Sequence, residues 1–164
     1  MYFKRLLFCS ILITLVFISC SKNVSSMKDG YYTAQMTDYD SFGWKEYLTV
    51  RVFGGKVIHI EYDAANQSGL IRSWDMDYMR YMNSISGIYP NAFTRFYEGE
   101  LLQKQSVGRI DHLSGATVSY YSFLKLAEAV LDNAFLGETK ISLVPRPDME
   151  GLINNPALRE EENK

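Results

Sequence analysis

The hydroxyl side chains with the clearest chemical context lie in the run Asp111-His112-Leu113-Ser114-Gly115-Ala116-Thr117. The apolar residues that follow recur at helical spacing as far as Phe135, and Gly137 comes next, so we expect a helix that begins at Thr117. The first N–H groups of a helix lack internal partners and carry the positive end of its dipole, and a glycine lets the backbone approach a ligand closely. This arrangement favours an anion such as a phosphate. The alternative is ordinary helix capping by Ser114 or Thr117.

The same run contains the residue types of a hydrolase. Ser114 or Thr117 would be the nucleophile, with His112 as base and Asp111 as its orienting acid. Neighbours in sequence at the start of a helix rarely reach the geometry that these roles need. We therefore predict no catalytic residue here, and interpret Asp111 and His112 as a polar lead-in to the helix.

The pattern Asp-x-x-Ser-Gly-Ala-Thr resembles the flavinylation motif of FMN-binding domains. These domains occur in the flavin-carrying subunits of sodium-pumping and Rnf-type respiratory complexes and in small bacterial lipoproteins. The resemblance implies that Thr117 carries FMN covalently, through a phosphoester made by a separate flavin transferase. It implies that Ser114, Gly115 and Ala116 form the phosphate-side turn, and that Asp111 is the upstream motif acid, which helps the transferase recognise or activate the threonine.

The resemblance covers roughly residues 28–134. Asp29-Gly30-Tyr31-Tyr32 resembles the opening strand of the family, residues 44–65 resemble its long hairpin, and residues 66–90 are similar to its lipoprotein branch. In place of the Thr-Pro-Gly-Leu-Gly loop of the respiratory subunits, this chain has Gln67-Ser68-Gly69-Leu70-Ile71. By this resemblance we expect Gly69 and Leu70 to contact the flavin.

The N-terminus has the pattern of a bacterial lipoprotein signal. Lys4 and Arg5 precede an apolar run over residues 6–18, and Ser19-Cys20 follows, which resembles a lipobox. We expect a signal peptide over residues 1–19, acylation of Cys20, and a tether over residues 20–28 that joins the lipid to the domain. The protein would then be lipid-anchored on the extracytoplasmic face of a membrane, periplasmic or at the cell surface. The alternative is cleavage without lipid attachment.

Composition narrows the chemistry. The chain has two cysteines, and because Cys9 lies in the signal, the processed chain keeps Cys20 alone, which excludes a disulfide, a cysteine–zinc cluster or a thiol nucleophile. We predict no metal site, so a flavin must supply any redox chemistry. The 17 Lys and Arg, two of them in the signal, are scattered among 19 Asp and Glu, which argues against a nucleic-acid partner.

Residues 29–137 are predicted to form one α+β domain, a small antiparallel sheet packed with helices, with the flavinylation turn at the start of the last long helix. Residues 138–164, rich in proline and charge, are predicted to be an irregular C-terminal extension. Alternating apolar residues and the Gly54-Gly55 turn signal indicate strands, and helical spacing indicates helices, over these ranges: strands 31–36, 47–53 and 56–63, helices 74–86, 91–103 and 117–135. Ile58 and Ile60 are expected to share one face of their strand, with His59 on the solvent side.

A stripe of aromatic and methionine residues recurs at helical spacing and is therefore predicted to fill the core; it includes Trp74, Tyr78, Tyr81 and Met82.

Three functions remain open from the sequence. The first is a lipid-anchored FMN carrier, not itself an enzyme, that passes electrons from a membrane donor to an external acceptor or partner reductase. The second is a surface lipoprotein that binds flavin, haem or another ring-shaped ligand reversibly. The third is a structural surface lipoprotein that has kept the fold without the cofactor.

Overall fold

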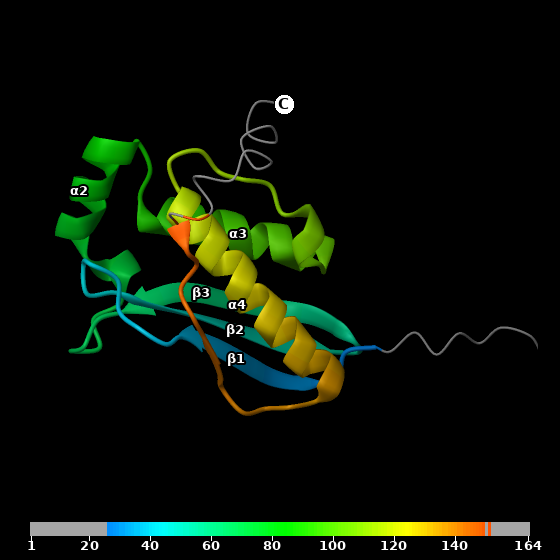
Figure 1. Ribbon diagram of the computed structural model, residues 1–164. Coiled ribbons are helices and arrows are strands. Elements are labelled where there is room, and N and C mark those ends of the chain that lie inside the picture. Colours follow the sequence, from blue (N-terminus) through cyan, green and yellow to red (C-terminus); the bar gives the residue numbers. More distant parts are fainter. Residues whose placement is uncertain (1–25, 150, 152–164) are drawn as a thin grey trace, which may run out of the picture.

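The computed structural model describes residues 26–149 and 151 (Figure 1), so the predicted signal peptide and Cys20 lie outside the described residues. The sheet has four strands in the order β3-β2-β1-β4. Strands β1 (Gly30–Met36), β2 (Lys45–Phe53) and β3 (Lys56–Ala65) are antiparallel, as predicted. The short strand β4 (Ser142–Val144) pairs in parallel with the free edge of β1, so the sheet is mixed. The α+β class is confirmed, and the fourth strand is an addition to the expected sheet.

The β2–β3 hairpin follows its sequence signals with one local departure. Gly54 and Gly55 both have positive φ, +60° and +74°, which suits the tight turn between two twisted strands. Along the hairpin, Arg51 lies opposite His59 but Val52 lies opposite Val57, so Ile58 forms a bulge. Ile58 is consequently 44% exposed, which corrects the expectation that it shares the buried face of Ile60. His59 is exposed, as predicted.

Three α-helices accompany the sheet within the described residues: α2 (Met76–Ser86), α3 (Pro90–Lys104) and α4 (Thr117–Leu136). Short 3-10 turns η1 (Arg72–Trp74) and η2 (Val107–Arg109) precede α2 and follow α3. Helix α3 packs against β3, and α4 packs against β1 and β2, so both cover the same face of the sheet (Figure 1). Pro90 is the first residue of α3, where its missing N–H is not needed, and left-handed Gly137 ends α4.

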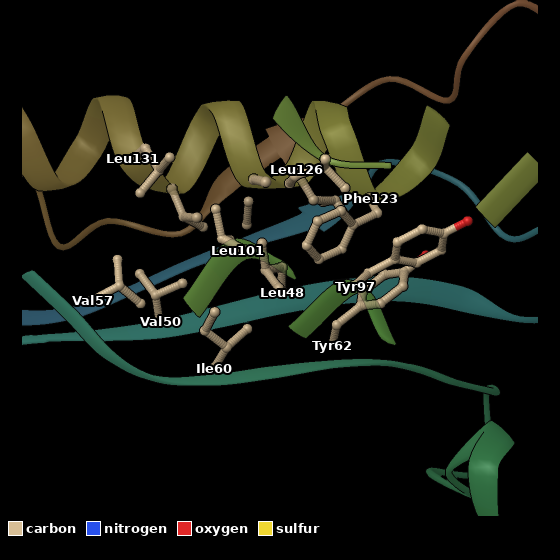
Figure 2. Packing of buried hydrophobic residues seen from close by; sticks show 14 of the residues in the cluster. Leu48, Val50, Val57, Ile60, Tyr62, Tyr97, Leu101, Phe123, Leu126 and Leu131 are labelled. Atoms are coloured by element: carbon tan, nitrogen blue, oxygen red, sulfur yellow. The ribbon is translucent and has the colours of Figure 1, made fainter. Parts of the chain in front are cut away.

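The core lies between this pair of helices and the sheet. Figure 2 shows Phe123 and Leu126 of α4 facing Leu48, Tyr62 and Tyr97. The rings of Phe123 and Tyr97 stack at 5.3 Å between centroids, and Phe123 meets Tyr62 edge-on at 4.9 Å. Each buried side chain of this size contributes about 1.5–3 kcal/mol, so this aromatic cluster stabilises the start of α4 against the sheet.

The aromatic stripe before α3 departs from its prediction. No residue of α2 is buried, and Trp74, Ile85 and Tyr81 are 73%, 65% and 49% exposed. Two half-buried side chains of α2 contact the rest of the domain: the Tyr78 ring lies 5.4 Å from that of Trp44, and Met82 packs against the hydrophobic core. Helix α2 projects at one end of the sheet (Figure 1), so most of its apolar residues lie on the surface. The predicted core role is wrong for Trp74 and Tyr81 and holds for Met82, which packs against the core.

Both predicted flanking segments contribute to the domain. Met27, in the expected tether, is buried, and the backbone N–H of Lys28 donates to the carbonyl oxygen of Ala134 at 2.8 Å. The expected extension supplies β4 and Arg146, whose guanidinium lies 3.1 Å from the buried carboxylate of Glu46. The folded unit therefore begins before residue 29 and continues past residue 137. Among the described residues no helix is both long and apolar enough to span a bilayer.

Candidate functional site

The motif turn stands directly before α4. Ser114 and Gly115 form a turn, Ala116 occupies the N-cap position with φ −119° and ψ 29°, and Thr117 is the first helical residue. No side chain caps this helix, so capping by Ser114 or Thr117 is wrong. The first amides of α4 are left without a side-chain acceptor, and they carry the positive end of a 20-residue helix.

Gly115 is required at its position for two independent reasons. Its φ is +82°, which side-chain-bearing residues adopt only at a cost. A Cβ there would also lie 2.6 Å from the carbonyl oxygen of Ser86 and 3.1 Å from Cγ2 of Ile88. The connection between α2 and α3 is therefore packed against the motif turn, and the close approach holds the turn in place.

The hydroxyl of Thr117 has a specific neighbour. Its Oγ1 lies 3.1 Å from Nε2 of His112, and the His112 ring packs edge-on against Tyr120 at 5.0 Å between centroids. His112 and Thr117 both lie on the protein surface, His112 exposed and Thr117 half-buried. The contact between nucleophile and base that the rejected hydrolase pattern requires, between Thr117 and His112, is therefore present, although residues so close in sequence rarely reach it.

Asp111 has a different partner. Its carboxylate lies 2.9 Å from Nζ of Lys104, which also donates to the carboxylate of Glu100 and to the carbonyl oxygen of Arg109. The hydrogen bond and charge of Lys104 lower the pKa of Asp111, so this exposed carboxylate stays ionised. Asp111 therefore joins the chain before the motif turn to Lys104 and Glu100 of α3. Within the described residues its carboxylate is paired with Lys104, and no hydrogen bond to His112 completes a nucleophile–base–acid series.

A buried polar network lies beneath the first turn of α4. The hydroxyl of Tyr62 donates to the carbonyl oxygen of Ser119 at 3.0 Å and also lies 3.3 Å from Oε1 of Glu46. Burial, and then the charge of Glu46, raise the pKa of Tyr62, which therefore remains a neutral donor. Glu46, only 2% exposed, is paired on its two oxygens with Arg72 at 3.4 Å and with Arg146 at 3.1 Å.

Arg72 is the polar group in this network with unused hydrogen-bonding capacity. It is 3% exposed, and neither Nε nor Nη2 has a hydrogen-bond partner within the described residues. Its guanidinium carbon lies 5.2 Å from the ring centroid of Phe93. Burial acts to lower the pKa of Arg72, but the carboxylate of Glu46 holds the guanidinium charged, and the net shift of its pKa is upward. Arg72 was missed from the sequence because an arginine between a loop and a predicted helix normally lies on the surface.

Gly69 and Leu70 lie in a compact loop. The side-chain oxygen of Asn66 accepts from the N–H groups of Ser68 and Leu70, at 2.9 Å and 3.0 Å, and left-handed Gly69 completes the turn. Leu70 is 40% exposed. Within the part of the chain that the structure describes, no hydrogen bond joins this loop to the motif turn, whose packing partners are Ser86 and Ile88.

The described residues contain no group of three or more His, Cys, Asp or Glu side chains placed to hold a metal ion. The residues at the motif turn do fit a flavin phosphate. The uncapped helix start offers N–H groups to a phosphate, and the close packing of Gly115 against Ser86 fixes the turn that presents them. The buried guanidinium of Arg72 is three polar contacts from Ser119, through Glu46 and Tyr62.

The fold and the N-terminal pattern define a small α+β lipoprotein, and relatives identify its family. The chain is 40% identical over 114 residues, 70% of this chain and 81% of the relative, to the 15 kDa lipoprotein of Treponema pallidum (strain Nichols). It therefore belongs to the family of that lipoprotein. No family model matches the chain.

A solved crystal structure has the same fold. The crystal structure of CPE2226 protein from Clostridium perfringens superimposes with a TM-score of 0.69 and 38% identity, covering 73% of this chain and 98% of that one. A solution structure of a protein from Clostridium thermocellum gives a TM-score of 0.46 and 26% identity, covering 66% of this chain and 92% of that one.

Proposed function

We propose that this lipoprotein is an electron carrier anchored by acyl chains on Cys20, with FMN held covalently through a phosphoester at Thr117. The observation that carries the proposal is the motif turn itself. Gly115 is packed against Ser86 in a conformation that excludes a side chain, and the helix start that follows has no side-chain cap. The uncapped N–H groups suit a phosphate, and the packing of Gly115 fixes the turn that presents them.

The contact between His112 and Thr117 supports attachment at this hydroxyl. In the transfer, Oγ1 of Thr117 attacks the flavin-bearing phosphorus of a flavin dinucleotide held by the transferase, the P–O bond to the other nucleotide breaks, and that nucleotide leaves as its monophosphate. The hydroxyl proton passes to Nε2 of His112, 3.1 Å away, when the imidazole carries its proton on Nδ1. The ion pair of Asp111 with Lys104 holds the residue directly before His112 against α3. The flavin transferase, as the partner that makes the bond, would meet an exposed and ordered turn.

FMN exchanges one or two electrons, and the chain itself supplies position and electrostatics. Covalent attachment matters for a protein outside the cytoplasm, since a dissociable cofactor would be lost by dilution. The reducing equivalents would come from a membrane donor and pass to an external acceptor.

The test is the intact mass of the full chain produced with a flavin transferase, together with flavin fluorescence in a denaturing gel. The expected result is a mass increase of one FMN minus water, absent in Thr117→Val. Thr139→Val is the matched control, because Thr139 is an exposed threonine outside the motif, and it is expected to keep the adduct.

An unmodified mass in the wild-type chain would reject the covalent carrier. If flavin fluorescence were then found only in the native protein and lost on denaturation, the function would instead be reversible binding of a ring-shaped ligand. The exposed aromatic side chains of Trp74 and Tyr81 on and beside α2 would be the first surface to examine for that ligand.

A further inference from the structure

We infer that the end of the domain where the chain enters from Cys20 rests on the lipid bilayer through a ring of exposed apolar side chains. This inference rests on the lipid anchor of the proposed function and is independent of the flavin. We call this surface the anchor end and define it by five exposed apolar residues, Tyr31, Phe53, Ile58, Phe135 and Leu136.

The anchor end is assembled around the entry of the chain. A Cβ on Gly55, at the β2–β3 turn, would lie 3.3 Å from Cβ of Ser26, and the N–H of Gly55 donates to the side chain of Asp29. Lys28 donates from its backbone to Ala134 and from Nζ to the carbonyl oxygen of Leu136, both at 2.8 Å. The β2–β3 turn, the start of β1 and the end of α4 therefore surround the first described residues (Figure 1).

Large apolar side chains are exposed at this end beside the charged side chains of Lys28, Asp29 and Lys56. Phe53, the last residue of β2, is 62% exposed, and Leu136, the last residue of α4, is 63% exposed. Tyr31, near the start of β1, is 60% exposed. Arg51 lies over the Tyr31 ring at 5.6 Å, and Lys56 pairs in register with Phe53. Aromatic rings with basic neighbours suit the interface between lipid headgroups and acyl chains.

The length of the tether indicates that the anchor end contacts the bilayer. From Cys20 to Met27 the chain spans seven residues, which reach at most about 25 Å when fully extended. Helix α4 has 20 residues and so measures about 30 Å. The tether therefore keeps the anchor end within about 25 Å of the bilayer in every orientation, whereas the opposite end, with Thr117 and α2, meets lipid only if the domain tips over. The anchor end is thus the surface that the tether itself brings to the lipid, although α2 also exposes apolar side chains.

Weak contacts between the anchor end and lipid are enough to orient the domain on the bilayer. Acyl chains on Cys20 already hold the domain at the membrane, so the apolar residues only have to orient a molecule that cannot leave. The domain is consequently held in one orientation. The anchor end faces lipid, and the turn of Thr117 lies about 30 Å farther from the membrane, which is the length of α4.

The experiment uses single cysteine variants of the acylated full chain, since Cys20 is the only cysteine after processing and its sulfur is occupied by lipid. An environment-sensitive dye is placed at Phe53→Cys, Leu136→Cys and, as the matched exposed control at the far end, Trp74→Cys, which is 73% exposed in the native chain. Each protein is reconstituted in vesicles of phosphatidylcholine and phosphatidylglycerol that carry a quencher near the top of the acyl chains.

We expect at least twofold quenching and a blue shift at positions 53 and 136, and no more than a tenth of that quenching at position 74. A second variant separates contact from mere proximity: Leu136→Ser is expected to reduce quenching of the dye at position 53 at least twofold. Equal quenching at the two ends, no quenching at the anchor end, or no effect of Leu136→Ser would overturn the inference. A processed chain without acyl groups on Cys20 would overturn it too, while leaving the mass test of FMN attachment at Thr117 unaffected.

Discussion

Replacing Gly115 by alanine tests the packing of the motif turn directly. The substitution adds one methyl group at a residue whose φ is +82° and whose new Cβ would lie 2.6 Å from the carbonyl oxygen of Ser86. The carbonyl belongs to the backbone, so it cannot rotate away as a flexible side chain would. Either the turn or the α2–α3 connection has to shift.

Two terms set the size of the effect. A side chain in the left-handed region costs about 1–2 kcal/mol, and overpacking against fixed atoms costs about 1–3 kcal/mol more. We therefore expect Gly115→Ala to lower the free energy of unfolding by about 2–5 kcal/mol. Gly87→Ala is the matched control, because Gly87 has φ +69° and nothing within 4 Å of its Cβ position, so it should show only the first term.

The assay is equilibrium urea unfolding followed by circular dichroism on both variants and the wild-type chain. With a urea dependence of about 1–3 kcal/mol per molar for a small domain, the extra term should move the midpoint of Gly115→Ala about 1 M below that of Gly87→Ala. The yield of FMN adduct in the presence of the transferase should fall for Gly115→Ala and persist for Gly87→Ala. Equal midpoints for the two alanine variants would refute the close packing of the turn against Ser86.

Two further predictions concern stability. Glu46→Gln should lower the free energy of unfolding by about 3–5 kcal/mol, because it leaves the buried charge of Arg72 and the charge of Arg146 without their carboxylate. Asp77→Asn, which breaks an exposed ion pair with Arg80, should cost under about 1 kcal/mol. Thermal unfolding of the two variants measures both losses, and equal losses would contradict the prediction. Burial raises the pKa of Glu98, so the folded state binds this proton more tightly than the unfolded state, and stability should fall as pH rises from about 4 through the raised pKa. Glu98→Gln should remove that fall in urea unfolding between pH 4 and 7, and an unchanged pH profile would show that another group causes it.

Much of the fold was accessible from periodicity. The strands after residue 30, the Gly54-Gly55 turn, Pro90 at the start of α3 and the long final helix all follow from local spacing and backbone preference. Strand β4 was missed because it has three residues and is stabilised by the edge of β1, which is distant in sequence. The bulge at Ile58 depends on the register with β2 and is likewise invisible in a single strand.

The site was predictable only in part. The turn at residues 114–117 and the start of the helix at Thr117 lie where the motif indicated. Arg72 and Glu46 belong to different segments, and their pairing with Arg146 arises only when the chain folds. The stripe on α2 has helical spacing, but spacing alone does not tell whether a neighbouring element exists to cover it.

Strand β4 also decides where this protein can be shortened. A chain ended at Gly137 would keep every residue of the three main strands and of α4, yet it would leave the backbone groups of Ala34, Gln35 and Met36 on an open sheet edge. Such an edge is a template for pairing with another molecule, so the truncated domain would tend to self-associate. The same cut would remove Arg146 and leave Glu46 with Arg72 as its one cationic partner. The segment after α4 therefore covers a sheet edge that would otherwise pair with the sheet of another molecule.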